Sequence, residues 1–232
     1  MAELVVALDV HKSSDIEVIL GSMPGDIAWY KVGLELFSAE GPATLTSLRE
    51  HEKNVFLDLK LHDIPRTVER SVRAIAKHGV QMLTVHASGG RDMLRAASEA
   101  AHALGAGAPK LIAVTTLTSL DQQDLVQLGI HQSIRDRALA LGEMALDAGI
   151  DGLVTSVDEL KALRFAFGDD PILVTPGIRM PMHNLADQKR VATPARAVRE
   201  GSNFLVVGRP ILESDNPPLA AQKILEDMRT AM

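Results

Sequence analysis

Three charged side chains stand close together in a stretch that otherwise has the composition of a buried strand. The stretch is FLDLKLHDIPRTV, and Asp58, Lys60 and Asp63 stand within six positions of it. Residues two apart in a strand point to the same face, so Asp58 and Lys60 are predicted to face the same way. Asp63 stands just before Pro65, which suits the first turn of a helix. The group is therefore either a structural cluster of ion pairs or a catalytic site.

Two more charged residues stand at neighbouring apolar runs: Asp9 directly follows the run 4–8, and Lys31 lies in the run 28–34. Groups at the ends of three neighbouring strands converge on one small volume. Charged groups held away from water lose hydration free energy, which their mutual attraction offsets only when the ion-pair geometry is excellent. An apolar core therefore costs less free energy than a cluster of charges. Because functional sites tolerate such costs, we interpret the five charges as a site.

Two glycine–arginine segments, TPGIR and VGRPI, follow the last two apolar runs. Gly177 and Gly208 let backbone amides approach an anion closely, and Arg179 and Arg209 each offer a fork of donors. The alternative is a pair of turns with incidental arginines. The pattern favours a phosphate site.

Eight apolar, β-branched runs predict the strands that must position these groups. They span residues 4–8, 28–34, 54–61, 81–87, 110–117, 151–157, 171–177 and 203–208. Eight units in 232 residues give about 29 residues per unit, which is typical of alternating strands and helices. We therefore predict an α/β fold with one domain over residues 1–232, a (β/α)8 TIM barrel whose site lies at the C-terminal ends of the strands. A doubly wound open sheet is the alternative.

Helical patterns lie between most of these runs. Val68, Val72 and Ile75 recur on one face before Gly79, which is a helix stop. A second stripe, also followed by a glycine, consists of Ala138, Leu141, Ala145 and Ala148. After the seventh run, MPMHNLADQKR favours a loop.

Composition excludes several kinds of site. The chain has no cysteine, so disulfides, thiolate metal sites and a cysteine nucleophile are excluded. A net charge of −6 gives no reason to expect nucleic acid, and no apolar run is long enough for a membrane span. The N-terminus lacks the features of a signal peptide, so we expect a cytoplasmic protein. The histidines show no H-x-x-x-H spacing for zinc, and His62 and His86 are interpreted as strand-end histidines bonded to neighbours rather than as catalytic groups.

Seven segments together carry a resemblance to a known family. They are ALDV (7–10), KVGLELF (31–37), FLDLKLHDIPRTV (56–68), VTTLTS (114–119), TPGIR (175–179), DQKRVATP (187–194) and VVGRPI (206–211). In these segments the sequence resembles the orotidine 5′-phosphate decarboxylases of the bacterial type, from residue 4 to about residue 225. The D-x-K-x-x-D-I-P-x-T pattern is highly specific, whereas glycine–arginine ends occur in many phosphate-binding barrels.

The resemblance implies a (β/α)8 barrel that acts as a homodimer, without metal or organic cofactor, and converts orotidine 5′-phosphate to uridine 5′-phosphate and CO2 in de novo pyrimidine synthesis. It implies that Lys60 is the proton donor and that Asp58 and Lys31 flank the reacting carbon. Asp63 and Thr67 are implied to reach into the site of the partner subunit.

The resemblance also implies the contacts that bind the substrate. Asp9 and Lys31 hold ribose hydroxyls, Thr118 faces the pyrimidine, and Gln188 bridges the base and the phosphate. The other phosphate contacts are Arg179, Gly208 and Arg209.

Two alternative functions remain. One is a magnesium-dependent relative, a 3-keto-L-gulonate 6-phosphate decarboxylase or hexulose-phosphate synthase. Those enzymes share D-x-K-x-x-D but carry a glutamate at the position of Lys31 and lack the continuation Ile64-Pro65-x-Thr67. The other alternative is a barrel that binds a nucleotide without turnover, which would not need so costly a set of charges.

Overall fold

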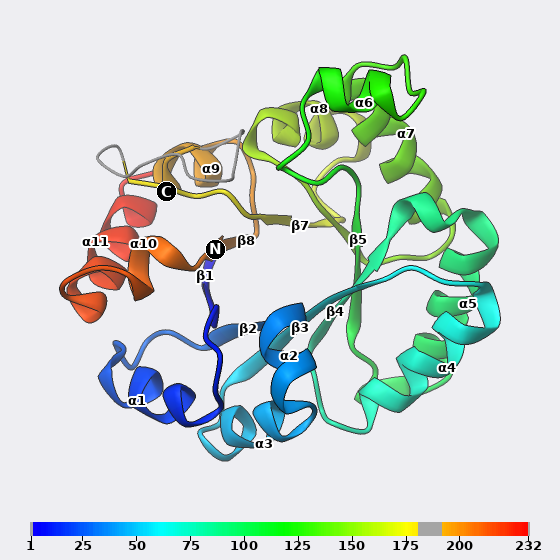
Figure 1. Ribbon diagram of the computed structural model, residues 1–232. Coiled ribbons are helices and arrows are strands. Elements are labelled where there is room, and N and C mark those ends of the chain that lie inside the picture. Colours follow the sequence, from blue (N-terminus) through cyan, green and yellow to red (C-terminus); the bar gives the residue numbers. More distant parts are fainter. Residues whose placement is uncertain (1, 181–191, 232) are drawn as a thin grey trace.

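Eight parallel strands close into a barrel within residues 2–180 and 192–231, the part of the chain that the computed structural model describes (Figure 1). The strands are β1 (Glu3–Ala7), β2 (Trp29–Gly33), β3 (Asn54–Leu61), β4 (Met82–His86), β5 (Lys110–Val114), β6 (Gly152–Val154), β7 (Ile172–Thr175) and β8 (Phe204–Val207). Each strand pairs with the next along the chain, and β8 pairs with β1. Every predicted apolar run overlaps one strand. The (β/α)8 barrel is thus confirmed, and the open sheet is wrong.

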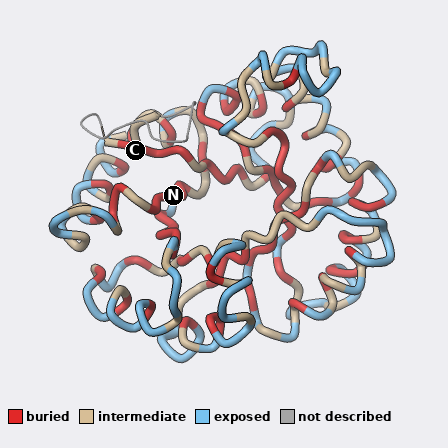
Figure 2. Tube along the Cα trace, viewed as in Figure 1, coloured by how far each residue is buried: buried red, intermediate tan, exposed pale blue. Residues whose placement is uncertain are grey.

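Helices surround the strands and turn their apolar faces inward (Figure 2). They are α1 (Ser14–Ser22), α2 (Leu34–Glu40), α3 (Ala43–Glu50), α4 (Pro65–Ala76), α5 (Arg91–His102), α6 (Gln122–Gln127), α7 (Ile134–Asp147), α8 (Val157–Phe167), α9 (Pro194–Arg199), α10 (Arg209–Leu212) and α11 (Pro217–Arg229). The predicted stripe of Val68, Val72 and Ile75 is buried on α4. The predicted stripe of α7 also faces the core: Ala138, Ala145 and Ala148 are buried, and Leu141 is half-buried and packs against the core. Gly142, beside Leu141, is buried as well.

Alternation along the strands divides the core into an outer and an inner layer. In β1, Leu4 and Val6 pack against the helices, whereas Val5 and Ala7 face the barrel interior. The same inner hydrophobic cluster includes Phe56, Met82, Ile112, Val174 and Val206. Trp29 and Phe204 add an edge-to-face contact with ring centroids 5.0 Å apart. The interior is therefore filled, and polar strand ends meet an apolar floor.

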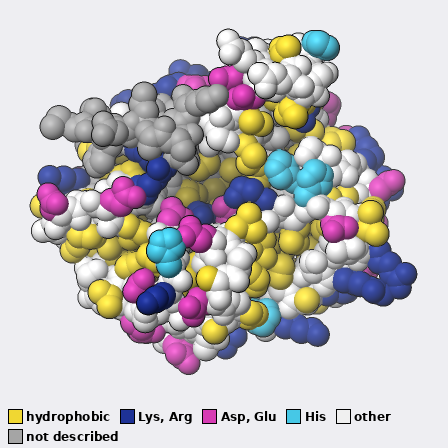
Figure 3. Space-filling view, viewed as in Figure 1, with side chains coloured by type: hydrophobic (Ala, Val, Ile, Leu, Met, Phe, Trp, Pro, Cys, Tyr) yellow, Lys and Arg dark blue, Asp and Glu magenta, His cyan; other side chains and the backbone are white. Residues whose placement is uncertain are grey.

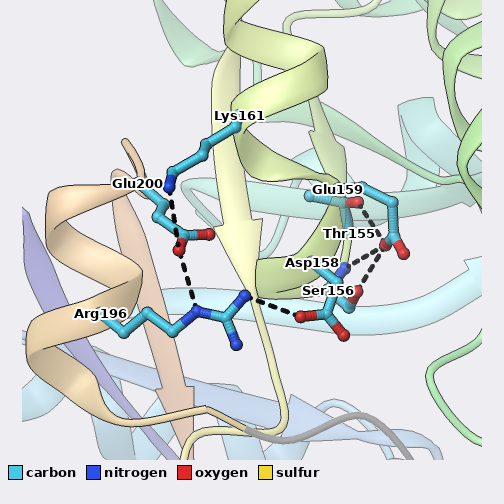
Figure 4. A network of polar contacts seen from close by, with 7 residues as sticks. All are labelled: Thr155, Ser156, Asp158, Glu159, Lys161, Arg196 and Glu200. Carbon is cyan, nitrogen blue, oxygen red and sulfur yellow. Dashed lines mark hydrogen bonds and ion pairs between the residues drawn. The ribbon is translucent and has the colours of Figure 1, made fainter.

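The two helices that flank β7 are joined by ion pairs around the partly exposed side chain of Arg196 (Figure 4). Arg196 on α9 donates to Asp158 Oδ1 on α8 over 2.8 Å and to Glu200 Oε1 over 2.9 Å. The Glu200 carboxylate also lies 3.7 Å from Lys161 Nζ. These contacts fix the start of α9 beside α8.

The chain after β7 is paired with the segment that leads into α9. Ile178 and Ala192 form a parallel bridge, in which the Arg179 N–H donates to the Ala192 carbonyl over 2.9 Å. This pairing places Arg179 beside the beginning of α9.

Candidate active site

The irregular end of β3 positions the first group of charges. Pairing with β4 is regular through Leu57↔Leu83 and resumes at Leu61↔Val85, so β3 contains extra residues between the two points. Within this bulge Lys60 has a φ of +50°, a left-handed conformation that is uncommon for a residue other than glycine. Such strain persists only when the surrounding structure holds it in place, and it is frequent at functional sites.

Carboxylates and ammonium groups alternate across the ends of β1, β2 and β3. Lys60 Nζ donates to Asp58 Oδ2 over 2.8 Å, and Lys31 Nζ lies 3.6 Å from the same oxygen. Lys31 Nζ also lies 3.7 Å from Asp9 Oδ1. The side chains of Lys31 and Asp58 are only 12% and 13% exposed, so their attraction is weakly screened by water. The structure thus brings Asp9, Lys31, Asp58 and Lys60 together.

Asp58 remains ionised in this setting. Burial on its own raises the pKa of a carboxyl group, but here the positive charges of Lys31 and Lys60 and hydrogen bonds from Lys60 and Thr84 outweigh it. The pKa of Asp58 is therefore below its ordinary value. A permanent negative charge in turn stabilises the ammonium groups beside it.

Asp63 and Thr67 lie apart from this cluster and are exposed. Pro65 begins α4, as its position predicted, with Ile64 as the N-cap, and Asp63 precedes the helix. A residue before proline is driven to extended backbone, which keeps the preceding chain outside the helix. Asp63 Oδ1 instead accepts the Ile64 N–H over 2.7 Å. Among the described residues no ion pair joins Asp63 to Lys31 or Lys60.

A cavity of about 240 Å³ opens beside the cluster. Figure 3 shows acidic and basic side chains gathered around a hollow at the centre of this face, with apolar side chains inside it. Its apolar lining includes Phe56, Val114, Val154, Val174 and Val206. Its polar lining includes Asp9, Lys31, Asp58, Lys60, Thr118, Arg179, Gly208 and Arg209. The cavity therefore combines an apolar floor with charges of both signs, as small polar ligands require.

At position 208 in the cavity lining there is no room for a side chain, because the carboxylate of Asp9 lies against the backbone of Gly208. A Cβ atom at Gly208 would stand 2.4 Å from Asp9 Oδ2. Gly177, in the other predicted phosphate loop, has a φ of +79°, which favours glycine. Arg179 is buried, and its Nη1 donates to the Ile178 carbonyl over 2.9 Å. Gln188, the remaining predicted contact, lies outside the described residues.

Sequence reasoning missed Thr84. This residue is fully buried in β4, and its hydroxyl contacts both Asp58 and Lys60. The available signal was a hydroxyl in the middle of the apolar run MLTVH, two residues after Met82 and therefore on the same face.

His62 and His86 stack at a centroid distance of 5.2 Å, and the Nδ1 of His86 is hydrogen-bonded to Ser88 Oγ at 3.0 Å. Burial lowers the pKa of His86, and electrostatic interactions with His62, Lys60 and Arg137 lower it further. His86 is therefore neutral near pH 7, as a hydrogen-bonded strand-end histidine.

Over the described ranges, no group of three or more histidine, aspartate or glutamate side chains is arranged to hold a metal ion. In the same ranges no helix has the length and apolar character to cross a membrane.

Comparison with known proteins agrees with this geometry. Residues 2–224 match the model of the orotidine 5′-phosphate decarboxylase / HUMPS family. The chain is 43% identical over 231 residues to the orotidine 5′-phosphate decarboxylase of Moorella thermoacetica, with 97% of this chain and 92% of that protein covered. It is 44% identical over 216 residues to that of Haemophilus influenzae strain PittEE, covering 93% and 94%.

A solved structure has the same fold. The crystal structure of orotidine 5′-phosphate decarboxylase from Lactobacillus acidophilus superposes with a TM-score of 0.85 at 36% identity, covering 98% of this chain and 99% of that one. The family match spans residues 2–224, a range that contains all eight strands and the charged residues of the site. The chain belongs to the orotidine 5′-phosphate decarboxylase / HUMPS family.

Proposed function

We propose that this chain is a carboxy-lyase that converts orotidine 5′-phosphate to uridine 5′-phosphate and CO2 in de novo pyrimidine nucleotide synthesis, a reaction we place in the cytoplasm. The observation that carries the proposal is the alternating row Asp9, Lys31, Asp58 and Lys60 on one side of the cavity. Arg179 and Arg209, which suit a phosphate, line the same cavity. Membership of the family supports the same reaction.

The proposed chemistry uses the ammonium group of Lys60 twice. When the bond between C6 and the carboxylate breaks, its electron pair stays on C6 and CO2 departs. A neighbouring carbonyl is not in place to delocalise this pair directly, so the site stabilises it by electrostatics. Lys60 Nζ supplies the positive charge and then transfers a proton to C6, which gives uridine 5′-phosphate.

Asp58 attracts the ammonium group of Lys60 and orients it before the reaction. Opposite unit charges 4 Å apart attract by about 4 kcal/mol at an effective dielectric of about 20, and the 2.8 Å contact here is shorter. Asp58 also lies near the carboxylate that departs, and repulsion between the two is relieved as CO2 leaves. Lys31 is held between Asp9 and Asp58, on the other side of the same carboxylate.

The remaining lining residues bind the parts of the substrate that do not react. Asp9 and Lys31 bind ribose hydroxyls, and Thr118 faces the pyrimidine. Arg179, Gly208 and Arg209 bind the phosphate, together with Gln188, which also contacts the base. Binding energy from a remote phosphate can be used to favour the transition state at C6.

The site is completed in a homodimer. Asp63 and Thr67 flank the N-terminus of α4, are exposed, and are proposed to enter the partner's cavity. Ile64, which is 67% exposed, lies between them and would be covered by a partner at this surface. The reaction needs no metal or organic cofactor in this proposal.

Lys31 opposes the magnesium-dependent alternative. Its ammonium group lies within 3.7 Å of two carboxylate oxygens that could otherwise hold a divalent cation. A positive charge at this position repels such an ion.

The fall in ultraviolet absorbance as orotidine 5′-phosphate is consumed, followed with excess EDTA, tests the proposal. We expect rapid turnover that EDTA does not reduce. Absence of turnover, together with magnesium-dependent conversion of a keto-sugar phosphate, would instead assign the chain to the metal-dependent branch of the family.

A further inference from the structure

We propose that Thr84 is a positioning residue for the decarboxylation, because its hydroxyl joins the backbone of Lys60 to the carboxylate of Asp58. This inference rests on the proposed function. The Lys60 N–H donates to Thr84 Oγ1 over 2.8 Å, and the same hydroxyl donates to Asp58 Oδ1 over 2.9 Å. One hydroxyl group thus uses both its acceptor and its donor capacity on the two central residues of the site.

The position of Thr84 in β4 explains why this contact is possible. Leu83 and Val85 belong to the outer layer of the core and Met82 to the inner layer, so alternation directs Thr84 inward. Its side chain is 0% exposed. A buried hydroxyl is costly unless it is hydrogen-bonded, and here both of its partners belong to the catalytic cluster.

Thr84 takes over a backbone contact that the sheet has lost. Because β3 is bulged between Leu57 and Leu61, the Lys60 N–H meets the Thr84 side chain instead of a strand carbonyl. The left-handed backbone of Lys60 is sterically unfavourable for a lysine and needs such support. The direction in which the lysine side chain leaves the strand therefore depends on the hydroxyl of Thr84.

The two oxygens of Asp58 have separate donors. Oδ1 accepts from Thr84, while Oδ2 accepts from Lys60 Nζ and lies 3.6 Å from Lys31 Nζ. When Lys60 has given its proton to C6, its attraction to Oδ2 weakens. The bond from Thr84 is unaffected by that transfer, so it keeps the carboxylate oriented through the catalytic cycle.

Three variants test the role of the hydroxyl. Thr84→Val keeps the branched shape and removes the hydroxyl, and Thr84→Ser keeps the hydroxyl. Thr44→Val is the control, since Thr44 is also fully buried and donates to the Gly41 carbonyl over 2.9 Å, on α3. Turnover is measured per nucleotide-binding site, counted by titration with uridine 5′-phosphate, so that loss of folded protein does not count as loss of rate.

We expect Thr84→Val to lower kcat by about 10- to 100-fold with little change in KM, which corresponds to loss of a hydrogen bond to a charged group. The acidic limb of its pH profile should move to higher pH, because Asp58 has lost a donor that lowers its pKa. Thr84→Ser and Thr44→Val should keep kcat close to that of the unaltered enzyme. A purely structural role would lower the number of binding sites but leave the pH profile in place.

Two results would overturn the inference: a Thr84→Val enzyme with unchanged kcat and pH profile, or a Thr84→Ser enzyme impaired as strongly as Thr84→Val. In either case the proposed function stands if the unaltered enzyme turns over orotidine 5′-phosphate. If the unaltered chain fails to turn over, the proposed function fails and this inference fails with it. Should Thr84→Val not fold, Thr84→Ser and Thr84→Ala differ by the hydroxyl alone and are compared in the same way.

Discussion

Asp58 receives hydrogen bonds on both carboxylate oxygens, from Thr84 on one and from Lys60 on the other. Because these contacts favour its charged form, they hold the pKa of Asp58 below the ordinary value in the folded protein. The carboxylate thus links the stability of the fold to pH, as well as serving the chemistry.

Acidification tests this linkage. A group with a depressed folded-state pKa contributes stability that is fully present above its unfolded-state pKa, about 3.9, and is lost as pH falls through the folded-state value. We expect the free energy of unfolding to fall less steeply below about pH 4 in Asp58→Asn than in the unaltered protein. Urea unfolding over a series of pH values measures the slope, and the exposed Asp170→Asn is the control. Equal slopes for all three proteins would contradict the assigned state of Asp58.

Gly208 allows a test of how closely Asp9 must be placed. A methyl group at this position would stand 2.4 Å from Asp9 Oδ2, so Gly208→Ala displaces the carboxylate. We expect kcat/KM to fall by about 10- to 100-fold, since small misplacements in a site have effects of this size. Gly107→Ala is the control, because a Cβ there would meet no atom within 4 Å. Steady-state kinetics with unchanged kcat/KM in Gly208→Ala would show that Asp9 need not hold its position.

The site was only partly predictable at the residue scale. Two-residue spacing predicted that Asp58 and Lys60 lie on one side, and their side chains do meet at 2.8 Å, although the strand is irregular at this point. The bulge and the left-handed backbone of Lys60 depend on how β3 pairs with β4, and the role of Thr84 depends on the bulge. Pairing between strands is a tertiary property that spacing along one segment does not contain.

At the scale of elements, the buried face of a helix could be predicted where burial alone determines the spacing of apolar residues. The apolar stripe of α4 followed the helical period and was found buried. On α7, Leu141 packs against the core as expected but is only half-buried, whereas its neighbour Gly142 is buried, because the helix approaches β6 closely there: a Cβ at Gly142 would stand 2.9 Å from Leu153 Cδ1. A close approach of helix and strand requires a residue without a side chain at the point of contact. The spacing of apolar residues along the sequence does not show where such a contact will be.

Two polar groups around α8 allow a comparison between buried and exposed contacts (Figure 4). Glu159 is buried, and its Oε2 accepts from Thr155 Oγ1 and from the N–H and hydroxyl of Ser156. We expect Glu159→Ala to lower the free energy of unfolding by about 1–3 kcal/mol, because it leaves buried donors without this acceptor. Arg196→Ala removes ion pairs of a side chain that is 42% exposed, so the expected loss is about 0–1 kcal/mol. Urea denaturation that gave the reverse order would contradict this assignment.

At the scale of the whole molecule, the barrel separates stability from chemistry. The interior is filled by apolar side chains such as Phe56 and Met82, and the charges collect where the strands end. Strand count and spacing predicted this architecture because each βα unit repeats the same local pattern. The proposed dimer, in contrast, depends on a surface formed between two chains.

Hybrid dimers test the sharing of sites. In a dimer of Lys60→Ala with Asp63→Ala, one site has both defects and the other has neither. If subunits exchange freely in an equal mixture, half of the dimers are hybrid, so activity should recover to about a quarter of that of the unaltered enzyme. Mixing Lys60→Ala with Lys31→Ala is the control, because both lysines belong to the same chain's site and each hybrid site keeps one defect. Failure to recover activity, with exchange demonstrated by mass spectrometry of tagged subunits, would remove the shared-site proposal.

The role of Lys60 as the cation and proton donor is tested most directly by the turnover of Lys60→Ala, measured beside its affinity for uridine 5′-phosphate. Lys53→Ala is the matched control, since Lys53 precedes the same strand and its Nζ donates to the Ile27 carbonyl over 3.1 Å, away from the cavity lining. We expect kcat of Lys60→Ala to fall by more than about 100-fold, the effect of losing a general acid, while nucleotide affinity is largely retained and Lys53→Ala is unaffected. A Lys60→Ala enzyme that kept its kcat would contradict the proposed mechanism.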